Sequence, residues 1–377
     1  MDKGLDTFFD FLPVLIFIIF VLIIIASTAA KLKPKKTARK LRQKATVPGE
    51  TKALTTAAQV ALPQALVDYM QSAPDAPDFD SFIAGFRAFA RDWYLQKLLP
   101  SFDALKKSFA IHEKVPFESL CLRGCIERNR DSTDMGPNFN FFGVNMLGIG
   151  TLVDSLLAIR ELVYGGRAPV PLRALAEQVA ADFPDESIRR RCLAVAGRFG
   201  TDSEPGNSLA SALSEFFADM VIAHPLSDGS RPYPAFFWFG GDIHHPQFAT
   251  PDGRHAADRF SYGCGAADGT ACAPTALLNS AARVAQDHAP CGSPITLSMG
   301  RRDASPQRIR EMVEGYFARG GSHVHVNIVS TDEMRAAQRD PDAHASLLVR
   351  ISGYSARFVT IDREWQDAII ARTEMGR

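Results

Sequence analysis

The first fifty residues divide into an apolar run and a basic run. Residues 11–30, from Phe11 to Ala30, carry no charge and have the length that crosses the hydrocarbon core of a bilayer as a helix. Residues 31–44 contain eight Lys or Arg and no acidic residue. The positive-inside rule therefore predicts a single-pass protein of the inner (cytoplasmic) membrane, with the rest of the chain in the cytoplasm.

Two other interpretations of these runs remain open. The small residues from Ser27 to Ala30 could supply the cleavage site of a secretory signal. Against this, residues 1–10 lack a positive region, the apolar core is long, and the basic run follows at once. The basic run could contact nucleic acid, but its position beside a span favours anionic lipid headgroups.

From residue 45 to 79 the chain is rich in Ala, Thr, Pro and Gln, and residues 72–77 have the composition of a spacer. We expect a linker with at most one short helix, and a globular region that starts near Asp80. Residues 80–111 then predict a long helix, because apolar side chains such as Phe82 and Phe86 recur at helical spacing.

The middle of the chain predicts two more helices, at 148–164 and 207–222, from the same periodicity. Between them and the last hundred residues, the segment 227–280 is rich in Gly, Pro and aromatic residues, and predicts loops and strands. Its aromatic cluster is more typical of a core than of a ligand site.

The last hundred residues alternate between helical and strand patterns. Ser305 predicts the start of a helix that ends at Gly320, and a strand follows at residues 323–329. Ser330 and Glu333 have the spacing of a capping box for a short helix. Further elements are expected: a strand at 347–351 and a terminal helix from Asp362. The alternation indicates an α/β layered or barrel architecture.

Composition excludes several classes of protein. The 377 residues carry 42 basic and 42 acidic side chains, which argues against a nucleic-acid-binding protein. The six cysteines show neither a Cys-x-x-Cys pair nor zinc spacing, and no P-loop or dinucleotide motif is present. His244–His245 and His323-x-His325 are candidate ligands, but the second pair lies on an alternating strand and lacks an acidic partner at ligand spacing, so we expect no bound metal.

Two short motifs carry candidate radical chemistry. In residues 350–354, Arg-Ile-Ser-Gly-Tyr, Gly353 has no side chain to oppose a planar Cα radical. A turn glycine that needs positive φ is the plain alternative. Upstream, Cys125 and Glu127 are spaced so that a thiol could relay a hydrogen atom while a carboxylate removes a proton. A buried structural cysteine and a solvated glutamate are the plain alternatives here.

Residues 323–377 and the run CLRGCIERNRDSTDMGPNFNFFGV resemble the glycine radical domain and the cysteine loop of the glycyl radical enzymes. The resemblance implies that Gly353 stores the radical, in a loop with Arg350, Ser352 and Tyr354, and that Cys125 becomes the thiyl. Glu127 would be the base. A single cysteine, followed by Glu two residues later, favours the glycerol and diol dehydratase and lyase branch over pyruvate formate-lyase.

The resemblance also implies a fold and partners. Family members form a ten-stranded β/α barrel, and this chain would supply its C-terminal half, preceded by one transmembrane helix. No cofactor is expected to be bound. The radical would be installed by a separate S-adenosylmethionine-dependent iron–sulfur activating enzyme, and the substrate would be a small polar organic molecule. The expected organisation is a tail at 1–10, a span at 11–30, a basic segment and linker at 31–79, a partial lyase/dehydratase domain at 80–290, and a glycine radical domain at 291–377.

The resemblance begins near Asp80, and the N-terminal half of the family's barrel has no counterpart in this chain. Three alternatives follow: a membrane-anchored dehydratase or lyase, a radical subunit that needs a separate half-barrel partner or self-association, and a non-catalytic membrane-tethered remnant. The sequence leaves the substrate and the oligomeric state open.

Overall fold

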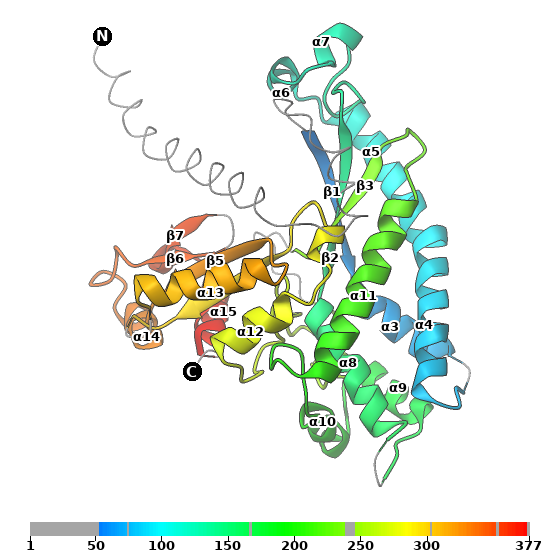
Figure 1. The fold of residues 1–377 in the computed structure, drawn as a ribbon, viewed down its shortest axis with the longest axis vertical. Coiled ribbons are helices and arrows are strands. Elements are labelled where there is room, and N and C mark those ends of the chain that lie inside the picture. The colour runs from blue at the N-terminus through cyan, green and yellow to red at the C-terminus, as the bar shows by residue number, and fades with distance from the viewer. Residues whose placement is uncertain are drawn as a thin grey trace. The chain divides into compact units, whose positions relative to one another are not determined.

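The structure is a computed structural model that describes residues 53–73, 75–165, 168–237, 246–301, 304–351 and 354–374. Contacts group the chain from Gly49 onward as one compact unit. Its first part is built on three parallel strands in the order β1 (Ala53–Ala61), β2 (Asn140–Leu147) and β3 (Arg231–Ala235). Figure 1 shows these strands side by side, with α11 running along β3.

The central strand β2 is buried from Phe142 onward, as expected for a parallel strand covered on both faces. The predicted helix at 80–111 is confirmed, as one continuous rod made of three parts. It consists of α4 (Phe79–Trp93), a π-helical turn (Tyr94–Leu98) and α5 (Leu99–His112). Phe82, Phe86 and Tyr94 lie on its buried face.

The prediction that residues 31–79 form a basic segment and a linker is wrong from residue 53 onward. Residues 53–61 form β1, which pairs with β2 along its whole length, and α3 (Leu62–Ser72) packs in the main core through Leu62 and Leu66. Threonine and valine favour strands although alanine does not, so composition alone did not separate this strand from a spacer. The folded region begins well before Asp80.

The remaining helices of this part are α8 (Ile149–Leu162), α9 (Leu172–Ala180), α10 (Glu186–Leu193) and α11 (Glu204–Ala223). The helices predicted at 148–164 and 207–222 are therefore confirmed. A buried ion cluster ties α8 to the loops after it. The Arg198 guanidinium lies 3.0 Å from Asp154 Oδ2 and 3.4 Å from Asp252 Oδ2, which compensates two carboxylates that have almost no exposure.

The C-terminal part alternates helix and strand, as predicted. Its elements are α12 (Pro274–Ala281), β4 (Pro294–Met299), α13 (Pro306–Ala318), β5 (His323–Ile328), α14 (Thr331–Arg339), β6 (Leu348–Arg350), β7 (Ser355–Arg357) and α15 (Arg363–Glu374). Strands β4 and β5 are parallel, while β6 and β7 form an antiparallel hairpin. The Ser305 cap is confirmed by its hydrogen bond from Arg308 N at 3.2 Å.

The capping box predicted at Ser330 and Glu333 is wrong. Ser330 is the N-cap residue of α14, but its side chain makes no capping hydrogen bond. The Glu333 carboxylate instead pairs with Arg301 at 3.2 Å, so a tertiary ion pair replaces the local contact.

The predicted location in the inner membrane is corrected here. No helix in the part of the chain that the structure describes is both long and apolar enough to cross a bilayer. The predicted span at 11–30 and the basic segment at 31–44 lie outside the described residues. Membrane anchoring therefore has no support in the structure, and the function proposed below does not use it.

The α/β fold class is confirmed by the parallel strand pairs and their intervening helices. The described strands lie in separate two- and three-stranded sheets, so a half-barrel within a ten-stranded barrel stays a prediction. The expected boundary at 290–291 also stays a prediction.

Candidate active site

The cysteine loop, residues 113–139, connects α5 to β2. It contains two short helices, α6 (Pro116–Cys121) and α7 (Cys125–Arg128). Gly124 precedes α7 with φ +101°, a conformation that favours glycine. A Cβ atom at Gly124 would also lie 2.7 Å from Gly136 O, so the turn that presents Cys125 requires this glycine.

The Cys125 side chain is buried, with 3% of its surface exposed, and it packs against Leu122. Burial raises the pKa of the Cys125 thiol, and the Asp131 carboxylate raises it further, whereas Arg128 opposes them. The thiol is therefore held in its S–H form at neutral pH. An S–H group suits the relay of a hydrogen atom, while a thiolate would be needed for nucleophilic attack.

Glu127 is exposed and lies in the same turn of helix as Cys125. Its Oε2 atom accepts a hydrogen bond from Gly124 N at 2.8 Å. Hydrogen bonds from the backbone of Glu127 itself and of Gly124 hold the pKa of the Glu127 carboxyl below its usual value. The group is thus ionised at neutral pH, as a base must be, although it caps its own helix in this structure.

The second predicted segment is the β6–β7 hairpin. Arg350 lies opposite Ser355 in the register, and Ile351 N donates to Tyr354 O at 3.0 Å. Arg350 and Tyr354 therefore flank the tip of the hairpin. Ser352 and Gly353 lie outside the described residues, so their predicted roles stay predictions.

The hairpin is held by a hydrophobic cluster of its own, separate from the main core. Phe358 is fully buried in it, and Val349 and Ile351 contribute from the hairpin. A side-chain contact joins the hairpin to β5, because Asn327 Oδ1 accepts a hydrogen bond from Arg350 N at 3.2 Å.

Strands β4 and β5 present a polar face, of which the sequence had singled out only the His323-x-His325 pair. The register places Thr296 beside His325 and Ser298 beside Asn327. The His325 side chain is 5% exposed, and neither ring nitrogen has a hydrogen-bond partner. Burial lowers the pKa of His325 to about 3, with His323 and Arg350 adding to the effect. The alternation of polar and apolar residues in 323–328 was the available signal.

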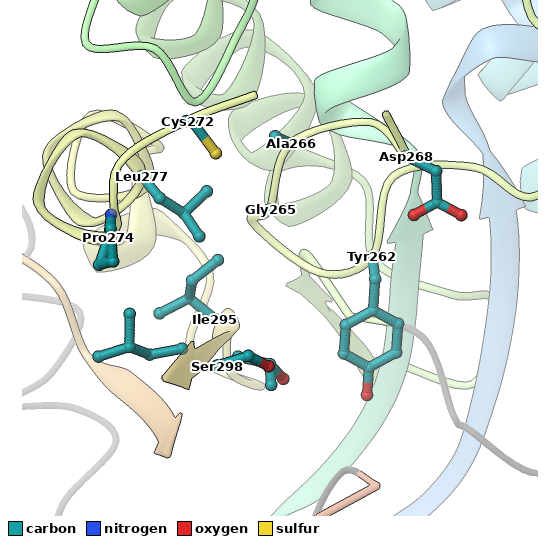
Figure 2. Close-up of a pocket in the computed structure, with 11 residues that line it drawn as sticks. Tyr262, Gly265, Ala266, Asp268, Cys272, Pro274, Leu277, Ile295 and Ser298 are labelled. Atoms are coloured by element: carbon teal, nitrogen blue, oxygen red, sulfur yellow. The ribbon is translucent and has the colours of Figure 1, made fainter. Parts of the chain in front are cut away.

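A small cavity of about 40 Å³ lies against β4, enough for a water molecule. Figure 2 shows Cys272 and Leu277 on one side of it and Tyr262 on the other. The cavity is lined by Tyr262, Gly265, Ala266, Asp268, Cys272, Pro274, Leu277, Ile295, Thr296, Leu297 and Ser298. None of these is a predicted site residue, so this cavity does not contain the predicted chemistry.

Glu215, Asp219 and His288 form a group that could hold a metal ion, with ligand atoms within 4.8 Å of one another. Sequence reasoning missed it because His288 lies far along the chain from the two carboxylates. The Glu215 and Asp219 side chains are exposed, and His288 Nδ1 is already 2.7 Å from Asp219 Oδ1. This group shares no residue with the cysteine loop or the hairpin.

The two predicted segments are not joined within the described residues, where no hydrogen bond or ion pair links the cysteine loop to the β6–β7 hairpin. Both segments carry exposed apolar side chains. Of the large hydrophobic residues that are exposed in the described chain, all but Leu193 lie on or beside these two segments: Ile111, Phe117, Leu120, Ile126, Ile328, Leu348 and Tyr354. Such surfaces are typical of interaction sites.

Comparison with known proteins identifies the protein family to which these two segments belong. Residues 55–241 match the family model described as pyruvate formate lyase-like, which includes the cysteine loop. Residues 263–359 match the glycine radical model, which includes the hairpin. The chain belongs to the glycyl radical enzyme family. The match starts near β1, so it also supports the corrected beginning of the folded region.

Curated glycyl radical enzymes are similar to this chain over most of its length. A trans-4-hydroxy-L-proline dehydratase of Clostridioides difficile is 25% identical over 80% of this chain and 39% of its own. An isethionate sulfite-lyase of Desulfovibrio desulfuricans is 28% identical over 76% and 35% respectively. The chain therefore spans less than half the length of these relatives.

Solved structures show the same fold. The glycerol-bound form of the B12-independent glycerol dehydratase from Clostridium butyricum superposes with a TM-score of 0.74 at 23% identity. The aligned region covers 86% of this chain and 44% of the dehydratase. The predicted family relationship is confirmed, whereas the roles of individual residues are not tested by these comparisons.

Proposed function

We propose that this chain is the radical-bearing part of a glycyl radical dehydratase or lyase. Gly353 stores the radical, flanked by Arg350, Ser352 and Tyr354, and Cys125 relays it to the substrate. The observation that carries the proposal is a buried Cys125 thiol on the same short helix as the exposed Glu127 carboxylate, in a chain that matches both family models.

The proposed chemistry balances with these groups. The Gly353 Cα radical takes the hydrogen atom of the Cys125 S–H bond, which leaves a thiyl radical on Cys125. The thiyl takes a hydrogen atom from a substrate carbon, and Glu127 accepts the proton of the neighbouring hydroxyl group while the leaving group departs. The product radical then takes the hydrogen atom back from Cys125, the resulting thiyl regains its hydrogen atom from Gly353, and Glu127 passes its proton to the departing group or to solvent, which closes the cycle.

The substrate class follows from the relatives. Their names describe dehydration of hydroxyproline and release of sulfite from isethionate, both eliminations from small polar molecules. The proposal is therefore a carbon–heteroatom lyase acting on such a molecule. Activation would come from a separate S-adenosylmethionine-dependent iron–sulfur enzyme, because the scattered cysteines of this chain offer no cluster motif.

A second candidate is a radical subunit that is inactive until other polypeptide completes its substrate chamber. The exposed apolar side chains Phe117, Ile126 and Leu348 favour it, because burying them against a partner would stabilise a complex. Product formation by the purified, activated chain alone would contradict this candidate. A radical without product, with activity restored by a partner, would support it.

The test of the proposed function compares Cys125→Ser with Cys121→Ser, an exposed cysteine four residues earlier. After anaerobic activation, both proteins should show an organic radical by electron paramagnetic resonance. In D₂O, only a chain with Cys125 should exchange deuterium onto Gly353 and change the hyperfine splitting of the signal. Product from hydroxyproline, isethionate, glycerol or 1,2-propanediol should be lost in Cys125→Ser alone. Normal turnover by Cys125→Ser would remove Cys125 from the mechanism.

A further inference from the structure

The cysteine loop contains very little apolar core. Its own hydrophobic cluster consists of Leu122 and Cys125 only. Such a loop needs another source of order if it is to hold a thiol in one place, because fixing each residue costs roughly 1–2 kcal/mol of backbone entropy. Much of that order comes from hydrogen bonds to one side chain, the carboxylate of Asp131, and Arg128 Nη1 adds one to Gly136 O at 2.8 Å.

Asp131 accepts hydrogen bonds from three residues on both sides of α7. Val115 N lies 3.1 Å from Oδ2, and Ser119 Oγ lies 3.0 Å from the same oxygen. Thr133 donates twice to Oδ1, from its backbone N at 3.1 Å and from its hydroxyl at 2.9 Å. The carboxylate thus joins the start of α6 to the chain that follows α7.

Ser119 extends this connection. Its side chain is buried, and its Oγ accepts a hydrogen bond from Ser132 N at 2.8 Å. The hydroxyl proton lies within reach of Asp131 Oδ2 and of Val115 O at 2.9 Å. Ser119 therefore links α6 to the backbone directly after Asp131.

The backbone of Asp131 then sets the position of the thiol. Its carbonyl oxygen accepts hydrogen bonds from Asp134 N at 2.9 Å and from Gly136 N at 3.0 Å, which bring Gly136 back over α7. A Cβ atom on Gly136 would lie 2.8 Å from Cys125 Sγ. Because Gly136 has no side chain, the Cys125 thiol packs directly against it. Arg130 N also donates a hydrogen bond to Cys125 O at 3.0 Å.

We propose that Asp131 is the positioning residue of the cysteine loop. It fixes the Cys125 thiol against Gly136 and places a negative charge near it. This inference rests on the proposed role of Cys125. It assigns Asp131 no contact with substrate.

The charges around Cys125 support a second effect of Asp131. After burial, Asp131 is the largest contribution that raises the pKa of the thiol; Glu118 and Glu127 raise it less, and Arg128 lowers it. Although burial opposes it, hydrogen bonds from Thr133, Ser119 and Val115 lower the pKa of Asp131, so the carboxylate is charged at neutral pH. Asp131 therefore disfavours the thiolate and favours the S–H form that the relay requires.

The experiment is pH-dependent alkylation of Cys125 by iodoacetamide, read from the Cys125 peptide by mass spectrometry in the unactivated full chain. Asp131→Asn keeps the shape of the side chain but removes the charge and part of its accepting capacity. We expect alkylation at pH 8 to be at least fivefold faster, with the midpoint of its pH profile moved to lower pH. Asp134→Asn is the matched control, since Asp134 forms an ion pair with Arg130 at 2.9 Å at a partly exposed site. In Asp134→Asn, the rate of Cys125 alkylation and the midpoint of its pH profile should equal those of the wild type.

Ser119→Ala removes a hydrogen bond to Asp131 without removing the Asp131 charge. It also provides a test if Asp131→Asn does not fold. Removing this hydroxyl should speed alkylation while leaving the pH midpoint in place, because the Asp131 charge remains. The proposal is overturned if Asp131→Asn or, where that variant does not fold, Ser119→Ala reacts like the wild type. Alkylation requires neither radical nor substrate, so this outcome is independent of whether Cys125→Ser abolishes turnover.

Discussion

The cysteine loop and the β6–β7 hairpin present their candidate residues in different ways. The hairpin rests on a cluster of eleven buried apolar side chains, from Val329 to Ile370, and is tied to β5 through Asn327. The apolar cluster of the cysteine loop contains only Leu122 and Cys125, and hydrogen bonds to Asp131 order much of the loop.

This difference suits two different tasks. A stored radical benefits from a rigid apolar support that excludes water, because interiors of that kind are densely packed. A residue that meets substrate benefits from a short loop that is ordered by polar contacts and adjusts locally. Substitutions near the hairpin should therefore change global stability, whereas substitutions in the cysteine loop should mainly change chemistry.

The largest effect is expected from Glu127→Gln in the cysteine loop. The radical and its exchange with solvent deuterium should remain, whereas elimination should slow by about 10²- to 10⁴-fold, because the base is lost. The measurement is product formation by the activated protein or its completed complex. Glu118→Gln, an exposed residue of α6, is the control. An unchanged rate for Glu127→Gln would place the base elsewhere.

Phe358→Ala tests the apolar support of the hairpin. Phe358 is fully buried, and its removal should cost about 3–5 kcal/mol in the free energy of unfolding, since it leaves a cavity in the cluster. Urea denaturation monitored by circular dichroism measures the change. Leu348→Ala removes a side chain that is 59% exposed on the same hairpin and should cost less than about 0.5 kcal/mol. Equal losses for the two variants would contradict the assignment of the cluster.

A smaller effect, for each pH unit, is expected from the titration of His325 beside the hairpin. Its pKa falls from 6.5 to about 3 on folding, so below pH 6.5 the unfolded chain binds a proton that the folded chain does not. Stability should therefore fall by up to about 1.4 kcal/mol for each pH unit between 6.5 and 3. His325→Gln should remove this part of the slope. Identical slopes for His325→Gln and the wild type would refute the buried neutral histidine.

Sequence patterns predicted the elements with strong periodicity, including the rod from Phe79 to His112, α8, α11 and the Ser305 cap. They missed β1, because alanine-rich composition does not distinguish a strand from a linker, whereas α3 is the one short helix that was allowed before the spacer. They also missed the role of Asp131, since its partners are polar residues at irregular spacing. The capping box predicted at Ser330 and Glu333 does not form, because Arg301, about thirty residues earlier in the chain, makes an ion pair with the Glu333 carboxylate.

Of the predicted site, Cys125 and Glu127 lie together on α7, and Arg350 and Tyr354 lie on the hairpin. Family motifs made these residues visible, because each motif occupies a short stretch of chain. How the two segments approach each other depends on tertiary or quaternary contacts that a short motif does not encode.

The central claim is that Gly353 stores a radical, and oxygen tests it most directly. Oxygen adds to a carbon-centred backbone radical and breaks the main chain there. Air exposure of the activated protein should therefore yield one fragment of residues 1 to about 352 and a short tail that begins near Tyr354. Mass spectrometry identifies both.

Gly353→Ala should give neither the paramagnetic signal nor the two fragments, because its methyl group opposes a planar radical. Its cost in stability should be about 1 kcal/mol or more if the loop needs positive φ at this position, and small otherwise. The account predicts signal and cleavage in the wild type and neither in the variant. Strictly anaerobic activation that yields no radical, followed by air exposure that yields no cut, would contradict it and leave Gly353 as a turn residue.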